Sequence, residues 1–141
     1  MKEWTIKVFK DKDANKDVFE EWMAEQDIEA QEKIRARLDM MSITKTWDRP
    51  YFGNLGDHIH EVIVECKNKQ YRPLGCFGVG HVFILLIGAT KTGGLRRGST
   101  KWDPPDAIAT ARSRKELVKT DGRYIGDYRP RERRTKTTSK K

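Results

Sequence analysis

The stretch that decides the fold runs from His60 to Lys91 and reads HEVIVECKNKQYRPLGCFGVGHVFILLIGATK. It contains three short apolar runs, Val62–Cys66, Tyr71–Phe77 and Val82–Ile87, with a short polar or glycine-containing turn between each pair. Strands joined by such short turns pair in antiparallel fashion, because a parallel pair needs a crossover of a dozen or more residues. The stretch therefore predicts a three-stranded antiparallel meander.

The sequence on either side of the meander predicts one more strand and three helices. Residues 4–9 alternate apolar and polar side chains, which is typical of a half-buried strand. Two helices should follow, the first capped from Asp11–Asn15 and the second by Asp27. Asp103-Pro104 predicts the start of a last helix. We expect an α+β fold in the order β-α-α-β-β-β-α, with the antiparallel sheet packed by an N-terminal helical hairpin and a C-terminal helix.

The 141 residues predict one domain, residues 1–128, followed by a basic and disordered tail, residues 129–141. Residues 42–57 and 92–102 are expected to be connections. The chain has a formal net charge of +8, but the tail holds seven Lys/Arg and one Glu and so carries most of it. Within the domain the helical half is acidic and the sheet half basic, which suggests that one face meets a polyanion. A solvated helix surface with a disordered tail is the alternative explanation.

Cysteine use and hydropathy indicate a reducing compartment and no membrane. Cys66 and Cys76 lie on neighbouring predicted strands without a C-x-x-C spacing, so we expect buried free thiols. The N-terminus does not resemble a signal peptide, and no apolar run approaches the ~20 residues that span a bilayer. We expect a soluble, cytoplasmic protein.

Motifs for nucleotides or metals are incomplete. Residues 93–100 approach a phosphate-binding P-loop, but Ser99 stands where the lysine is needed. The glycines between Gly75 and Gly80 lie between strands and mark a turn. His58-x-His60 could place two imidazoles together, yet a third ligand with credible spacing is missing. We therefore expect no cofactor and no metal.

Metal-free RNA cleavage fits the basic residues better. A base must take the proton of the ribose 2′-hydroxyl, an acid must protonate the leaving 5′-oxygen, and cations must stabilise the phosphate between them. Lysine can be the base where neighbouring cations lower its pKa, and arginine clamps phosphate with two hydrogen bonds. The cations expected to converge at the loop end of the last meander strand are Arg72, Lys91, Arg96, Arg97 and Lys101. A merely solvated basic loop is the alternative.

Four short motifs resemble the RelE/HigB superfamily of bacterial and phage toxins, particularly its phage-derived branch. That branch has Glu-Leu-Arg on one strand, Tyr-Arg on the next, an apolar strand ending in Leu-His-Gly-Phe-x-Lys-Lys, and Thr-Pro-x-x-Glu-Ile-x-x-Ala at the last helix. The matching residues here are Glu61-Val62-Ile63, Tyr71-Arg72, Leu86-Ile87-Gly88-Ala89-Thr90-Lys91 and Asp103-Pro104 with Ile108 and Ala111. The resemblance covers roughly residues 1–120 and has the element order expected above.

The resemblance implies the toxin of a type II toxin–antitoxin system, an endoribonuclease that cleaves mRNA free or on the ribosome. Its implied partner is an antitoxin, often of helix-turn-helix type. Carried across by position, Arg72 would be the phosphate clamp and Lys91 a base or phosphate ligand. Lys101 and His60 are further catalytic candidates, and Glu61 would orient a cation. The residues expected to bind RNA are Arg96, Arg97, Glu61 and Lys69.

The chain departs from the family pattern at three positions. Ile63 stands where the family has an arginine, Thr92 replaces the second lysine, and Ala89 replaces a bulky aromatic residue. The loop from Lys91 to Pro104 is longer than usual, and its arginines could replace the lost charges. The alternative is a non-catalytic protein, similar to RelE or ParE, that binds gyrase, nucleic acid or a host factor.

Overall fold

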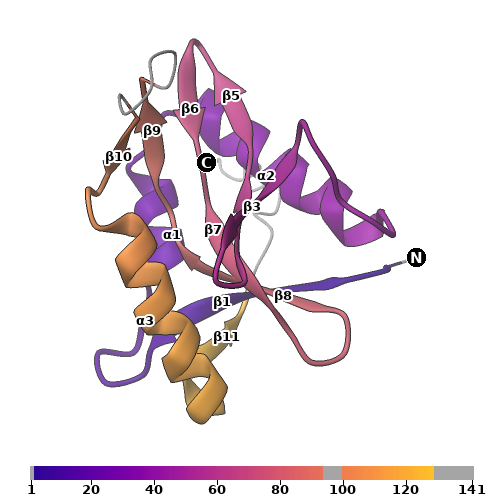
Figure 1. The fold of residues 1–141 in the computed structure, drawn as a ribbon, viewed down its shortest axis with the longest axis vertical. Coiled ribbons are helices and arrows are strands. Elements are labelled where there is room, and N and C mark those ends of the chain that lie inside the picture. The colour runs from indigo at the N-terminus through magenta and orange to yellow at the C-terminus, as the bar shows by residue number, and fades with distance from the viewer. Residues whose placement is uncertain (1, 94–99, 129–141) are drawn as a thin grey trace, which may run out of the picture.

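The computed structural model describes residues 2–93 and 100–128 and has the predicted α+β class (Figure 1). Its helices are α1 (Val18–Ala24), α2 (Ile28–Ile43), α3 (Ala107–Thr120) and the short 3-10 helix η1 (Gly122–Tyr124). The N-terminal strands are β1 (Thr5–Asp11) and β2 (Lys16–Asp17), and β3 (Phe52–Gly56) precedes the meander. The meander itself comprises β4 (Ile59–Val62), β5 (Val64–Cys66), β6 (Lys69–Tyr71), β7 (Leu74–Gly78), β8 (Val82–Ile87) and β9 (Thr90–Thr92). The last strands are β10 (Lys101–Asp103) and β11 (Ile125–Asp127).

The three meander strands pair in the predicted antiparallel way, but each of them is interrupted once. The interruptions lie at Ile63, at Arg72-Pro73 and at Gly88-Ala89. Backbone hydrogen bonds continue across them, because Arg72 N–H donates to the Ala89 carbonyl at 2.8 Å and Val62 N–H to the Pro73 carbonyl at 2.8 Å. The three breaks are thus side by side, and we call this line the bend.

The bend divides the meander between two sheets. On one side, a large sheet of seven strands has the order β11-β1-β8-β7-β4-β3, with β2 paired to β1. On the other side, a small sheet of four strands has the order β10-β9-β6-β5. In Figure 1 the small sheet occupies the upper part of the molecule and the large sheet the lower part.

Two expectations about the strands are corrected: that the sheet is antiparallel throughout, and that it contains only the strands predicted from the sequence. β1 lies parallel to β8, with Thr5 opposite Val82, so the sheet is not wholly antiparallel. The chain has room for this arrangement because two helices and most of the meander separate the two strands. β2, β3, β10 and β11 were not predicted. Residues 52–56 and 101–102 were assigned to connections, and all four strands are too short to show a clear alternation.

The helices cover both faces of the large sheet. α1 and α2 pack on one face, where Phe19, Met23 and Ile34 join the first core cluster. α3 packs on the other face through Ala107 and Ala111 in the second cluster. Figure 1 shows α3 and α2 on opposite sides of the strands. Within the described part of the chain, no helix is long and apolar enough to cross a membrane.

Two of the three expected helix starts differ from the structure. Asp27 caps α2 as predicted, its Oδ1 accepting from the Ala30 N–H at 2.9 Å. Asp17, and not Asp11–Asn15, caps α1. α3 begins at Ala107, because Asp103 ends β10 by pairing with Thr90. Separately, Cys66 and Cys76 are buried free thiols, as expected.

Candidate functional site

A buried carboxylate joins two cations at the bend. Glu61 on β4 is 4% exposed, and its Oε1 lies 3.2 Å from Arg72 Nε and 3.6 Å from Lys91 Nζ. The Arg72 side chain is 10% exposed and the Lys91 side chain 24%. Two cations on one carboxylate leave an excess of one positive charge. We call these three side chains the bend cluster.

The backbone at the bend sets where these side chains point. Tyr71 and Thr90 are paired across β6 and β9, and both are buried on the face that packs against α1 and α2. Successive side chains of a strand point to opposite faces. Arg72 and Lys91 therefore leave the sheet on the other face, where they reach Glu61. Arg72 is held further by its Nη1, which donates to the Tyr71 carbonyl at 3.2 Å.

Burial gives Arg72 its electrostatic character. Removal from water lowers the pKa of the Arg72 guanidinium below its usual value, and the adjacent Glu61 carboxylate opposes that shift. A guanidinium nevertheless stays protonated in proteins. A cation that has lost most of its water interacts more strongly with an incoming anion than a solvated one does. The bend cluster can therefore bind a phosphate group while Glu61 holds its cations in place.

Arg49 is a further cation near the cluster, and sequence reasoning missed it. A Cβ added at Gly53 would lie 2.9 Å from Arg49 Nη2 and 3.2 Å from Glu61 Oε2, so both side chains border the bare backbone of β3. The positive charge of Arg49 also lowers the pKa of Arg72. Arg49 lies in the stretch 42–57 that was read as a connection. The missing arginine at Ile63 was the available hint that another residue supplies this charge.

The outer face of the small sheet continues from Lys91. Lys91 is paired with Gln70 on one side and with Trp102 on the other, and Gln70 is paired with Glu65. Directly paired residues share a face of a sheet. One row, running Glu65, Gln70, Lys91, Trp102, thus crosses the small sheet from β5 to β10. All four side chains are exposed or half-buried.

Two predicted lysines lie on the opposite face of the small sheet. Lys101 is paired with Thr92, one residue away from the pair of Lys91 with Trp102. Lys69 is two residues from Tyr71 on the same strand, with its Nζ 5.5 Å from the Tyr71 ring. Lys101 therefore does not converge with Lys91 as expected, because successive side chains of a strand point to opposite faces. Lys69 does not join the bend cluster either.

His60 also lies away from the bend cluster. It neighbours Glu61 on β4 and so points to the other face, where its ring stacks on Phe52 at 5.3 Å and meets Phe77 edge-on at 5.0 Å. Burial, with a smaller effect of His58, lowers the pKa of His60. This imidazole is therefore packed among aromatic rings. We expected His60 to join Arg72 and Lys91 as a catalytic candidate, and the structure does not bring it to them.

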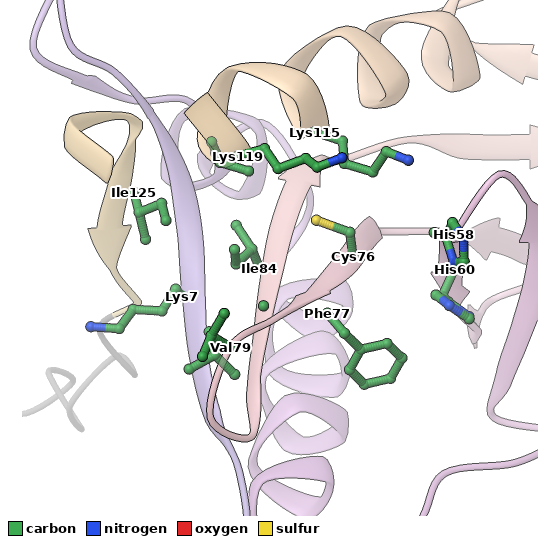
Figure 2. A pocket seen from close by; sticks show the side chains of 13 residues that line it. Lys7, His58, His60, Cys76, Phe77, Val79, Ile84, Lys115, Lys119 and Ile125 are labelled. Atoms are coloured by element: carbon green, nitrogen blue, oxygen red, sulfur yellow. The ribbon is translucent and has the colours of Figure 1, made fainter. Parts of the chain in front are cut away.

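His60 lines a hollow of about 650 Å³ with a mainly apolar wall. Figure 2 shows His58 and His60 at one end, Lys7 at the other, and Lys115 and Lys119 reaching in from α3. Cys76 lies in its floor, and burial raises the pKa of this thiol to about 11, which makes it a poor nucleophile at neutral pH.

Other expectations fall outside these sites. Arg96, Arg97 and the tail 129–141 lie outside the described residues. Across residues 2–93 and 100–128, no three His, Cys, Asp or Glu side chains gather in a way that could hold a metal ion.

Comparison with known proteins identifies the family. The family model described as "Phage derived protein Gp49-like (DUF891)" matches residues 21–116. The match includes Arg49, the whole bend cluster and Trp102. No curated protein and no solved structure matches the chain. Because the match spans more than half of the sequence, the chain belongs to the phage-derived Gp49-like family.

Proposed function

We propose that this protein is the toxin of a type II toxin–antitoxin system and a metal-independent mRNA endoribonuclease. Membership of the Gp49-like family, which is associated with toxin–antitoxin systems, supports the first part. The observation that carries the second part is the bend cluster. Arg72 and Lys91 are two partly desolvated cations, anchored by one buried carboxylate, on a face that α1 and α2 leave open. That arrangement suits an RNA phosphate.

The proposed reaction is an internal displacement at phosphorus. The ribose 2′-oxygen loses its proton and attacks, the bond to the 5′-oxygen breaks, and that oxygen takes a proton from solvent water, so that the products are a 2′,3′-cyclic phosphate and a 5′-hydroxyl. Arg72 holds the phosphate oxygens and stabilises the charge that grows on them in the transition state. Lys91, beside it, is a second phosphate ligand or, once it has lost its own proton to solvent, the base that accepts the 2′-hydroxyl proton. Glu61 is a positioning residue, since its carboxylate is engaged by both cations.

The proposal extends to fold family and partners. We assign the chain to the RelE/HigB superfamily on the strength of the motifs Glu61-Val62-Ile63 and Tyr71-Arg72, which both border the bend. Its partners would then be a cognate antitoxin of helix-turn-helix type and mRNA, free or on the ribosome. The site of action would be the cytoplasm. The tail 129–141 would add affinity for phosphate that does not depend on sequence.

One observation favours a second candidate function. The family arginine on the first meander strand is Ile63 here, and Ile63 lies in the bend with its carbonyl accepting from Arg37 Nη1. This strand therefore supplies only Glu61 to the cluster. A protein of the same fold that binds gyrase, nucleic acid or a host factor without cleaving RNA would need no more.

Controlled expression with mapping of mRNA ends by primer extension tests the proposal. The variants are Arg72→Lys, which keeps a cation beside Glu61 but loses the planar fork, and Lys91→Gln. The control is Lys119→Gln, which removes a lysine from the hollow. We expect growth arrest and mapped cuts with wild type and the control, and at least tenfold fewer cuts with both variants. Arrest without cuts would favour the binding protein, and cuts unaffected by either variant would refute the site.

A further inference from the structure

We infer that Trp102 is a stacking platform for the RNA base next to the phosphate held by the bend cluster, an inference that rests on the proposed function. Trp102 is paired directly with Lys91 across β9 and β10, so the indole and the ammonium share a face. The Lys91 Nζ lies 5.1 Å from the centre of the indole ring and 3.6 Å from Glu61 Oε1. The ring is thus within reach of a nucleotide whose phosphate occupies the cluster.

The packing of Trp102 suits a rigid platform. The indole is half-buried, and it packs against the second core cluster, whose members include Ala107 and Ala111 of α3. One part of the ring is therefore fixed by apolar contacts, while the Lys91 ammonium lies over its face. Aromatic side chains held in this way bind bases by stacking, irrespective of sequence, because every base has a π-face.

Lys91 connects the two subsites. In the free protein its ammonium is shared between the Glu61 carboxylate and the indole face. An arriving phosphate offers this ammonium a full negative charge, which is a stronger partner than a ring face. The ammonium then leaves the ring, and the base that belongs to the phosphate takes its place. Gln70 and Glu65, farther along the same row, lie on the opposite side of Lys91 from Trp102.

The test compares two octamers with equal numbers of phosphates. One is 2′-O-methyl oligouridine, which has no free 2′-hydroxyl to attack, and the other is its abasic counterpart. We expect wild type to bind the oligouridine about tenfold more tightly in fluorescence anisotropy, the effect of one stacked base. Trp102→Leu, which keeps apolar packing against α3, should bind both octamers equally. Trp102→Phe should retain a preference.

The outcomes separate the platform from the phosphate site. Equal affinity of wild type for both octamers, or an undiminished preference in Trp102→Leu, would refute the platform and leave the phosphate site intact. Lys91→Gln should lower the affinity of the protein for both octamers to the same extent. If it weakens neither, or if neither octamer binds wild type, the phosphate site itself is refuted, and the platform with it.

Discussion

The large and small sheets share the three strands of the meander, yet they use their faces differently. In the large sheet, β4 and β8 contribute buried residues to both core clusters, because α1 and α2 cover one face and α3 the other. In the small sheet, only the face with Val64 and Tyr71 is buried. The opposite face carries the polar row from Glu65 to Trp102. One half of the meander thus stabilises the fold, and the other half presents chemistry.

The use of the sheet faces changes at the bend. The geometry of the bend also explains which residues occur there. Pro73 has no N–H to donate and follows Arg72 where the strand pairing shifts. Gly88 lies against Trp22 of α1, with no room for a side chain. Glu61, Arg72 and Lys91 meet at this line, so a buried ion cluster joins the two sheets. The comparison teaches that the same ion pairs hold the sheets together and form the candidate site.

The largest expected effect comes from removing the carboxylate that joins the sheets. Glu61→Ala leaves the Arg72 guanidinium buried without a counter-charge, which should cost about 3–5 kcal/mol in the free energy of unfolding. Urea titration followed by circular dichroism measures it. The control is Glu65→Ala on the exposed row, which should change stability by less than about 0.5 kcal/mol. The double variant Glu61→Gln/Arg72→Gln should recover most of the loss. Equal costs for Glu61→Ala and Glu65→Ala would show that the cluster does not join the sheets.

The next effect tests the steric side of the bend. A Cβ at Gly88 would lie 2.0 Å from Trp22 Cδ2, so Gly88→Ala must displace an indole packed against the core. Overpacking of this kind costs about 1–3 kcal/mol. The matched control is Gly126→Ala on β11, where the nearest atom is 3.5 Å away and the cost should be small. Thermal unfolding measures the stability of the two variants. Equal stability of Gly88→Ala and Gly126→Ala would contradict the account.

A smaller effect on stability, with a clear effect on binding, is expected at Gly53. A Cβ there would lie 2.9 Å from Arg49 Nη2, the end of a flexible side chain that can move away. Gly53→Ala should therefore cost less than about 1 kcal/mol in the free energy of unfolding but move the Arg49 side chain away from the bend cluster. RNA affinity should fall severalfold, and to the same extent as in Arg49→Gln. If Gly53→Ala binds RNA as wild type does while Arg49→Gln does not, Arg49 reaches the RNA by another route.

The smallest expected effect concerns His60, which packs among aromatic rings in the large sheet. Its pKa in the folded protein is below the ordinary 6.5, so between these values the unfolded chain binds more protons. Stability should therefore fall as the pH drops through about 6.5 towards the lower folded pKa. The free energy of unfolding of the His60→Phe variant, measured by urea titration, should fall less than that of wild type between pH 7.5 and 5.5. Identical pH dependence in the two proteins would show that His60 does not contribute.

The meander, the class of fold and the burial of the main helix faces could be predicted from the sequence, because they rest on local periodicity and short turns. Ile34 and Leu38, at helical spacing, are fully buried as that periodicity requires. The parallel pairing of β1 with β8 could not be predicted in this way. This pairing depends on how segments far apart in the chain meet, and the local pattern of either strand carries no information about that.

The candidate site was predictable to a similar degree. Arg72, Lys91 and Glu61 were each singled out from motifs, and the structure brings them together. Their catalytic roles stay predictions. Lys101 and His60 were misplaced because the strand register, which decides the face of each side chain, cannot be read from a motif. Arg49 was missed because it approaches across the bare backbone of Gly53, a tertiary contact without a sequence pattern.

The most direct test of the central claim is the salt dependence of RNA affinity, measured by anisotropy with wild type, Lys91→Gln and Lys119→Gln. The two variants lose the same charge, one at the bend cluster and one in the hollow beside α3. If the cluster holds an RNA phosphate, Lys91→Gln should lower the slope of log affinity against log salt by about 0.7, the value for one phosphate contact on a single strand. Lys119→Gln should leave the slope unchanged. Equal slopes for Lys91→Gln and wild type would contradict the account.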